Sequence, residues 1–203
     1  MTPSQNITCQ TVTWSVGDTP LDHGPCVAAI GNFDGVHRGH ATVIAAAIDA
    51  ARAKGVAAAA VTFDPHPREF FRHEDAPFHL ADRAEKDRLL AALGLDRVIH
   101  VTFDDNLRCT DASAFVSDVL PALGVTDLFA GSDFAFGRGR GGDLDTINAI
   151  GSGIGISASA VSLMSDANSA VISSSRIRAA LQAGEVEQAG SMLGHDWAVT
   201  GVV

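Results

Sequence analysis

Short apolar runs alternate along this chain with longer segments in which apolar positions recur every three or four residues. Residues 27–30 form a continuous apolar run that ends at Gly31, and a run this short predicts a buried strand rather than a helix. Residues 37–54 come next, with their apolar positions on one face and Gly55 directly after them. This second pattern predicts an amphipathic helix that stops at the glycine.

The same two patterns continue to residue 193. Further strands are predicted at residues 56–63, 97–101, 127–130 and 156–163, and further helices at 84–93, 112–123, 143–150, 174–183 and 185–193. Strands separated by helical crossovers predict an α/β fold, a parallel sheet with helices on both faces. Ligands bind such folds beyond the carboxyl ends of the strands, so the loops that directly follow strands should carry the function.

The loop after the strand at 27–30 carries the string GNFDGVHRGH, from Gly31 to His40. His37 and His40 stand three residues apart at a helix start and therefore share one face. Free backbone N–H groups and the positive end of the helix dipole suit a polyphosphate there. Gly39, between the two histidines, is expected to leave room for the ligand. An isolated HxxH would favour two surface histidines beside an ordinary turn, but the whole string after a buried strand favours a phosphate site.

A second string, SSSRIR at residues 173–178, opens the predicted helix at 174–183. Ser173 is a good N-cap, and Ser174 and Ser175 add hydroxyls and unpaired N–H groups at the helix start. Arg178 shares the face of these two serines, whereas Arg176 points elsewhere. We therefore assign Arg178, rather than Arg176, to the phosphates and expect its side chain to face solvent or ligand.

The string GNFDGVHRGH closely resembles the HxGH signature of the nucleotidyltransferases, in the form found in prokaryotic FAD synthetases. Three further strings follow in the family's order, TFDPHP at 62–67, GSDFAFG at 131–137 and ISSSRIR at 172–178. The resemblance runs from about Cys26 to the end of the chain. It implies a Rossmann-like fold of the nucleotidyltransferase type and the transfer of AMP from ATP to FMN with Mg²⁺, giving FAD and pyrophosphate by in-line displacement without a covalent enzyme intermediate.

The resemblance also implies roles for individual residues. Catalytic roles, on the ATP phosphates, fall to His37, His40, Ser174, Ser175 and Arg178. Substrate-binding roles fall to residues of the same strings: Gly31, Asn32, Phe33, Asp34, Gly39, Asp64, Pro65, His66, Pro67 and Asp133.

Within this set, two prolines suggest a stiff, extended loop at 64–67 that walls the flavin ring. Asp133 is expected to reach the metal or the phosphates, whereas Phe134 and Phe136 are expected to pack in the core. Where Val171 stands, the family often has a basic residue, so one ATP contact is expected to be missing.

Composition limits the classes of molecule that the protein is expected to bind. The chain has 203 residues, 46% of them hydrophobic, which suits one domain with a buried core. Its net charge of -10, with only 14 Lys and Arg residues, argues against nucleic acid as a partner. The three cysteines are far apart, which argues against a disulfide framework or a zinc site. We find no signal-peptide pattern and no apolar run long enough for a membrane, and therefore expect a cytoplasmic protein.

Three other functions share parts of these patterns. Related transferases use the same histidine motif on pantetheine phosphate, nicotinamide mononucleotide or small alcohol phosphates. Class I aminoacyl-tRNA synthetases also carry HxGH, but this chain is short and acidic. A non-catalytic flavin carrier is the third alternative, although it would not explain two intact phosphate motifs.

The end of the sequence suggests a second module. Residues 1–195 are expected to form the adenylyltransferase domain, and residues 196–203 to be the start of a truncated riboflavin kinase barrel. In most bacterial relatives such a kinase module follows, so we expect it in the parent protein. A lone strand cannot form a barrel. We therefore expect the present chain to be a piece of a bifunctional enzyme, with poorly ordered last residues and no riboflavin kinase activity.

Overall fold

The computed structural model describes residues 9–71, 78–166 and 169–199. This part of the chain forms a sheet of six parallel strands in the order β1-β4-β3-β2-β5-β6. The strands are β1 (Gln10–Trp14), β2 (Cys26–Ile30), β3 (Ala57–Asp64), β4 (Arg97–Thr102), β5 (Val125–Gly131) and β6 (Ser157–Val161). The order reverses at β2, because β3 and β4 extend the sheet on one side of it and β5 and β6 on the other. Such a switch point opens a crevice at the carboxyl ends of the strands.

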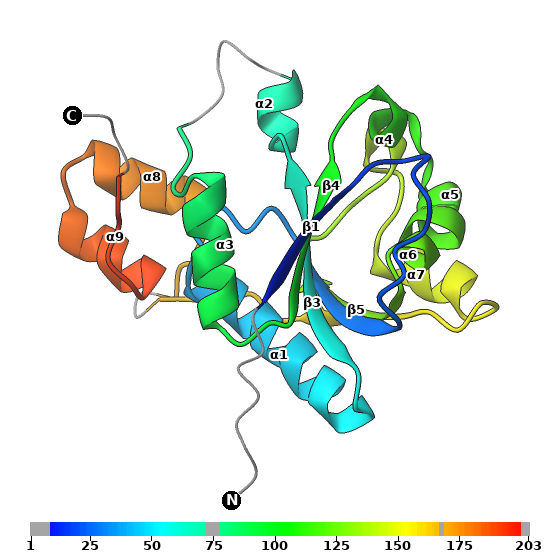
Figure 1. The fold of residues 1–203 in the computed structure, drawn as a ribbon. Coiled ribbons are helices and arrows are strands. Elements are labelled where there is room, and N and C mark those ends of the chain that lie inside the picture. The colour runs from blue at the N-terminus through cyan, green and yellow to red at the C-terminus, as the bar shows by residue number, and fades with distance from the viewer. Residues whose placement is uncertain (1–8, 72–77, 167–168, 200–203) are drawn as a thin grey trace, which may run out of the picture.

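Helices cover both faces of the sheet, which confirms the predicted architecture (Figure 1). One face carries α1 (Arg38–Lys54) and α3 (Arg83–Ala92). The other carries α4 (Asp105–Cys109), α5 (Ala112–Ala114), the π-helical turn Phe115–Val119, α6 (Leu120–Ala122) and α7 (Leu144–Gly151). A short helix, α2 (Pro67–Phe71), follows β3 directly. The last two helices, α8 (Ser174–Gln182) and α9 (Val186–Leu193), pack on each other around a small apolar cluster of their own.

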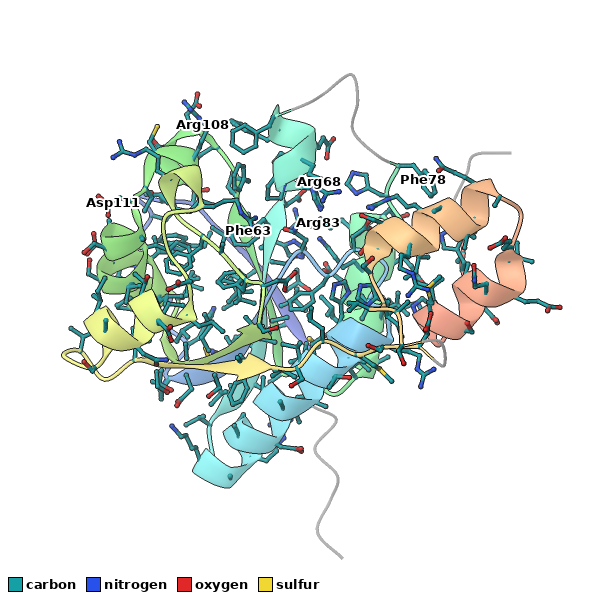
Figure 2. All side chains as sticks on the ribbon, turned by 180° about the vertical axis from the view of Figure 1, so that it is seen from behind. Phe63, Arg68, Phe78, Arg83, Arg108 and Asp111 are labelled. Carbon is teal, nitrogen blue, oxygen red and sulfur yellow. The ribbon has the colours of Figure 1, made fainter. Side chains whose placement is uncertain are left out.

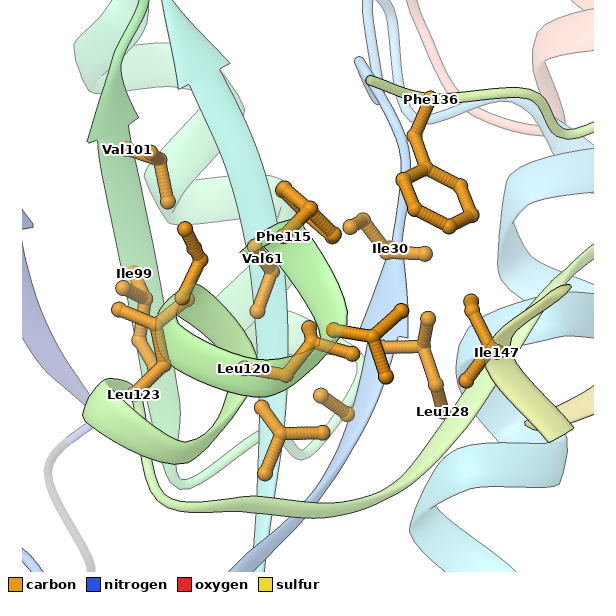
Figure 3. Close-up of a cluster of buried hydrophobic side chains, with 14 of the residues drawn as sticks. Ile30, Val61, Ile99, Val101, Phe115, Leu120, Leu123, Leu128, Phe136 and Ile147 are labelled. Atoms are coloured by element: carbon orange, nitrogen blue, oxygen red, sulfur yellow. The ribbon is translucent and has the colours of Figure 1, made fainter. Parts of the chain in front are cut away.

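The core explains the continuous apolar runs of the central strands. Alternate residues of β2 enter opposite faces, so Ala28 and Ile30 join the cluster under α4 to α7 while Val27 and Ala29 join the cluster under α1. A strand that is buried on both faces needs apolar side chains at every position. Figure 3 shows the first cluster, in which branched side chains of the sheet meet those of the covering helices, such as Leu120 and Ile147.

Four elements differ from the prediction. Strand β1 was not predicted. Among the described strands it pairs only with β4, at the sheet edge, so its sequence QTVTW lacks the apolar run of a central strand. The short helices α2 and α4 were also missed, because a single turn has no readable period. The helix predicted at 112–123 is interrupted by the π-helical turn just before Pro121, a residue without an N–H for the helical ladder.

The segment after α9 turns back over the protein. The Trp197 indole donates a hydrogen bond from Nε1 to the Leu80 carbonyl at 2.9 Å. Residues 196–199 are not in a strand. We expected the last residues to be poorly ordered and to begin a strand. These predictions concern mainly residues 200–203, which lie outside the described residues. Among the helices in the described ranges, none is long and apolar enough to cross a membrane.

Candidate active site

The loop between β2 and α1 holds an unusual backbone at the switch point. Phe33 and Val36 have φ angles of 48° and 39°, in the left-handed region that side chains other than glycine avoid. Gly35 between them has a φ of 76°, and a Cβ there would lie 2.9 Å from Leu80 Cβ. Both strained side chains are buried, Phe33 at 1% exposure and Val36 at 4%, so packing holds the loop in this shape. Strain of this kind concentrates at functional sites.

The two histidines of this loop stack on each other. His37 caps α1, and its Nδ1 accepts a hydrogen bond from the His40 backbone N–H at 3.2 Å. The ring centroids lie 3.5 Å apart at 15°, and Phe33 meets the His40 ring edge-on at 5.3 Å. Because Nδ1 of a neutral His37 accepts, its proton must sit on Nε2, which leaves that N–H as a donor.

Gly39 makes room for this stack. A Cβ on Gly39 would lie 3.2 Å from Cε1 and Nδ1 of His37 and 3.6 Å from the Ile172 carbonyl oxygen. The absent side chain of Gly39 therefore lets His37 lie over the first turn of α1. The expected room for a ligand at this glycine stays a prediction.

Burial keeps both imidazoles neutral near pH 7. It lowers the pKa of His37 to about 4, against a partly opposing effect of Asp34. Burial also lowers the pKa of His40 well below its ordinary value, and the charge of Lys86, together with that of His37 when it is protonated, lowers it further. In the free protein the pair therefore acts through N–H donors and not through net charge. His40 Nδ1 is buried and has no hydrogen-bond partner among the described residues.

We expect the free energy of unfolding to fall as the pH is lowered from 7 to 5. The pKa of His37 is about 4 in the folded chain against an ordinary value of 6.5. Between these values the unfolded chain binds the proton more readily, so the stabilisation is present above about pH 6.5 and is lost as the pH falls toward 4. This histidine contributes a slope of up to about 1.4 kcal/mol per pH unit.

Urea unfolding at several pH values measures that slope. His37→Asn is the matched variant, because asparagine also caps a helix but does not titrate. The variant should show a shallower dependence on pH than the parent chain. Equal slopes in the two proteins would contradict the buried, neutral state of His37.

Asp34 joins three segments of the site. Its Oδ1 accepts hydrogen bonds from the backbone N–H groups of Leu80 at 2.9 Å and Ala81 at 3.3 Å. Its backbone carbonyl accepts a hydrogen bond from the Ser174 hydroxyl at 3.0 Å. The start of α8 is thus fastened to the histidine loop, although the two lie 140 residues apart in sequence.

Arg178 completes this junction and is buried. Its Nη2 forms an ion pair with Oδ2 of Asp34, and its Nε donates to the Phe78 carbonyl at 2.7 Å. The residue is only 8% exposed, and burial lowers its pKa. The side chain therefore does not face solvent, and its expected contact with the ligand stays a prediction. A guanidinium at this depth needs a carboxylate partner, and Asp34 supplies it.

The other residues of the serine string lie largely as predicted. Ser173 caps α8 by accepting a hydrogen bond from the Arg176 N–H at 3.4 Å. Arg176 does point away from the serine face, toward Asp166, with 2.5 Å between Nη2 and Oδ2. Ser175 is exposed at the first turn of the helix.

The loop after β3 departs from the expected extended shape. Pro67 begins helix α2, a position that suits proline because the first helical N–H needs no partner. Asp64 forms an ion pair with Arg83 at 2.8 Å. His66 Nδ1 accepts the Arg68 backbone N–H at 3.0 Å, and burial lowers the pKa of His66 to about 4.

An aromatic cluster lies behind this loop. Phe103, just after β4, meets the rings of Phe63, Phe70 and Phe71 edge-on at centroid distances of 6.2, 5.3 and 5.7 Å. Phe71 is 60% exposed. Figure 2 shows Phe63, Arg68 and Arg83 toward the open end of the sheet, between α2 and α8. An apolar wall and cations therefore occur at the same edge.

Asp133 lies apart from the contacts described so far. It is exposed just beyond β5, the neighbour of β2, and its Oδ1 would be 2.9 Å from a Cβ on Gly131. Phe136 is buried in the core with Phe134 packed against it, as predicted. Over the residues that the structure describes, no three His, Cys, Asp or Glu side chains are grouped to bind a metal.

Two basic residues of α3 were missed by the sequence analysis. Arg83 binds Asp64, and Lys86 donates from Nζ to the Thr62 hydroxyl at 3.4 Å. Both reach the carboxyl ends of the strands from a helix that carries no informative string. The only feature of the sequence that could have indicated them is their position on the face of α3 that also carries Leu89 and Leu90, which are buried.

Comparison with known proteins places these residues in a family. A family model described as FAD synthetase matches residues 19–176. The bifunctional riboflavin kinase/FMN adenylyltransferase of Pseudomonas fluorescens is 39% identical over 183 residues, which are 90% of this chain and 58% of that protein. The enzyme of the same name from Escherichia coli K12 is 37% identical, over 88% of this chain and 57% of the relative. The chain thus spans a little more than half the length of these bifunctional relatives.

Two further proteins extend the comparison. A crystal structure described as a macrolide-efflux protein from Streptococcus pneumoniae has a TM-score of 0.80, with 24% identity over 93% of this chain and 72% of that one. This likeness supports the α/β fold alone. The FAD synthetase of Listeria monocytogenes is 34% identical over 188 residues, 90% of this chain and 74% of the relative. With most of its length matched by the family model and by this relative, the chain belongs to the FAD synthetase family.

Proposed function

We propose that the chain transfers the AMP part of ATP to the phosphate of FMN, giving FAD and pyrophosphate. Family membership supports the reaction class, and relatives named FMN adenylyltransferase support the acceptor. The position of the site supports it as well, because the two phosphate-binding strings meet at the switch point of the sheet.

One observation carries the proposal, the stacked and neutral pair His37 and His40 at the first turn of α1. His37 Nε2 is a donor, and the buried Nδ1 of His40 has no partner in the described part of the chain. A buried polar atom without a protein partner lacks the hydrogen bond that most such atoms have, and a ligand oxygen could supply it. Phosphate oxygens fit, since they also accept from the free N–H groups at a helix start.

In the proposed reaction, an oxygen of the FMN phosphate attacks the α-phosphorus of ATP as the bond to pyrophosphate breaks. No protein atom forms a covalent bond. The chain's contribution is to hold the two phosphates in line and to stabilise charge on the oxygens. His37 and His40 donate to the triphosphate from one side. Ser175, exposed at the first turn of α8, donates from the other.

In this proposal Arg178 positions the active-site segments, whereas its place on the serine face of the helix suggested direct contact with the phosphates. Its ion pair with Asp34 and its bond to Phe78 hold α8 against the histidine loop. Because Asp34 partly neutralises the charge of Arg178, the attraction between this guanidinium and the phosphates acts over a longer distance. We therefore propose that Arg178 mainly positions the two halves of the phosphate site.

We also propose that Mg²⁺ takes part in the reaction and that Asp133 is its ligand from the protein. Magnesium in nucleotide-dependent enzymes is bound mostly by substrate phosphates and water, with one or two carboxylates. Asp133 fits as a single ligand because it is exposed beside the central strand. Bound with ATP, the ion supplies neutralisation of the triphosphate charge.

The proposed domain covers residues 1–195. His195 packs with this domain, because its Nε2 lies 2.9 Å from the Gly35 carbonyl oxygen in the histidine loop. The family match at 19–176 ends before this contact. The segment after α9 thus adds to the packing of the active-site loop.

The test is FAD formation by the purified chain with ATP, Mg²⁺ and FMN, followed by chromatography. Parallel reactions contain pantetheine phosphate or nicotinamide mononucleotide in place of FMN. We expect FAD and pyrophosphate in equal amounts and no product from the other acceptors. A folded protein that makes no FAD but adenylylates another acceptor would falsify the proposed substrate.

A further inference from the structure

Lys86 of α3 lies between the histidine loop, proposed to bind ATP, and the loop after β3, expected to bind the flavin. Its Nζ donates to the Thr62 hydroxyl, and that hydroxyl donates to the Asn32 carbonyl of the histidine loop at 3.1 Å. Thr62 stands two residues before Asp64, the start of the loop at 64–67 that is expected to wall the flavin ring. Lys86 is also close enough to His40 for its charge to depress the pKa of that histidine.

The ammonium of Lys86 is half-buried and has no carboxylate within ion-pair distance in the described ranges. Burial lowers its pKa, and the charges of Asp64, Asp34 and Asp87 act on it only from farther away. Its one hydrogen bond to a residue that the structure describes, at 3.4 Å, is long. An ammonium has further N–H donors, and leaving a partly buried cation without a direct counter-ion costs free energy.

Contacts on either side hold α3 in the orientation that presents Lys86. Arg83, one turn earlier, binds Asp64 at 2.8 Å. Asp87, the next residue, binds Nε2 of the fully buried His100 at 2.7 Å. Thr62 and His100 are register partners on β3 and β4, so Lys86 and Asp87 bind neighbouring strands. The helix is therefore fixed by ion pairs that do not use the charge of Lys86.

We propose that Lys86 binds the phosphate of FMN, the attacking group of the reaction, beside the ATP phosphates held by the histidines. The inference rests on the proposed function and adds a residue to it. Two phosphates that approach for in-line displacement repel each other, and a cation between them reduces that repulsion. Lys86 lies where these groups must meet, since it contacts the end of β3 on the flavin side and acts on His40 on the ATP side.

The test separates the phosphate from the flavin ring. Dissociation constants for FMN and for riboflavin, which lacks the phosphate, are measured by flavin fluorescence with the parent chain and with Lys86→Met. The parent should bind FMN more tightly than riboflavin. In the variant, FMN should bind about 10- to 100-fold more weakly, as expected for a charged hydrogen bond, and riboflavin binding should change less than about twofold. Affinity for ATP should also be nearly unchanged.

Controls address folding and charge. Lys54→Met removes a lysine that is paired with Asp127 at the far end of α1, and it should alter neither dissociation constant. Lys86→Arg keeps the charge and should restore part of the preference for FMN. If Lys86→Met does not fold, Lys86→Gln and Lys86→Arg provide the same comparison.

Other results would overturn the assignment. An unchanged ratio of FMN to riboflavin affinity in Lys86→Met, or an equal loss for both flavins, would show that Lys86 does not bind the FMN phosphate. A selective loss of ATP affinity would place the residue on the other substrate. Failure of the parent chain to form FAD refutes the proposed function instead, and the binding comparison still decides on Lys86 because it needs no turnover.

Discussion

Replacement of His40 by alanine should lower the rate of FAD formation about 100- to 1,000-fold, the usual cost of removing one donor that stabilises transition-state charge. The His40 ring stacks on His37 and meets Phe33 edge-on, so its position is set before a substrate binds. Burial keeps the ring neutral, and its Nδ1 has no partner in the described segments. These features suit a group that is arranged for a ligand.

The stability of His40→Ala should change little. The variant loses ring packing but also removes a buried polar atom without a partner, and these effects have opposite signs. Turnover with saturating substrates and urea unfolding, measured on the same preparation, separate the two consequences. His40→Gln, which keeps an N–H donor, should recover part of the rate.

His23→Ala is the matched control for the rate measurement. His23 is exposed before β2, at the opposite end of that strand from the site. Its substitution should leave the rate within about twofold of the parent, in line with ordinary surface changes. A rate for His40→Ala close to that of His23→Ala would remove the histidine pair from the mechanism.

Replacement of Arg178 by alanine should cost about 3–5 kcal/mol of unfolding free energy, because it leaves the buried carboxylate of Asp34 without its partner. Activity should fall as well, since α8 would no longer be held against the histidine loop. A loss of this size is a large part of the stability of an ordinary domain. Urea unfolding monitored by circular dichroism measures it.

Arg176→Ala is the internal comparison on the same helix. Arg176 is paired with Asp166, but its side chain is 33% exposed, so water can replace the lost contacts. We expect a loss of about 1 kcal/mol, in the range of exposed ion pairs. If Arg178→Ala were no more destabilising than Arg176→Ala, the buried ion pair would not be a main source of stability.

A double-mutant cycle tests the coupling directly. Asp34→Asn and Arg178→Met should each destabilise the protein, whereas the double variant should lose less than the sum of the single losses. Removal of both charges avoids the uncompensated charge that either single change leaves behind. Strict additivity would indicate that the two residues act independently.

The local features of the fold were predicted correctly because neighbouring residues encode them. Ser173 caps α8 as predicted, and Gly55 ends α1 in the left-handed conformation. The phase of α8 was also predicted correctly, since Arg176 and Arg178 do lie on different faces. Caps and helical phase depend on residues within about one turn, so a single sequence contains the information.

Contacts between distant segments were not predictable in the same way. Arg178 was placed on the correct face, but the sequence does not show that Asp34, 144 residues earlier, lies opposite it. Lys86 was overlooked because its place beside Thr62 depends on how α3 packs on the sheet. Gly39 was identified, but the His37 ring over it was not.

The sequence by itself determined the alternation of strands and helices, the position of the histidine loop after a buried strand, and the resemblance to the FAD synthetases. Only the tertiary structure decided which charged groups are buried, which imidazoles are neutral and which lysine reaches Thr62 near the end of β3. The physical reason is that burial and charge coupling depend on every segment that packs around a group. Periodicity and capping depend on the nearest residues alone.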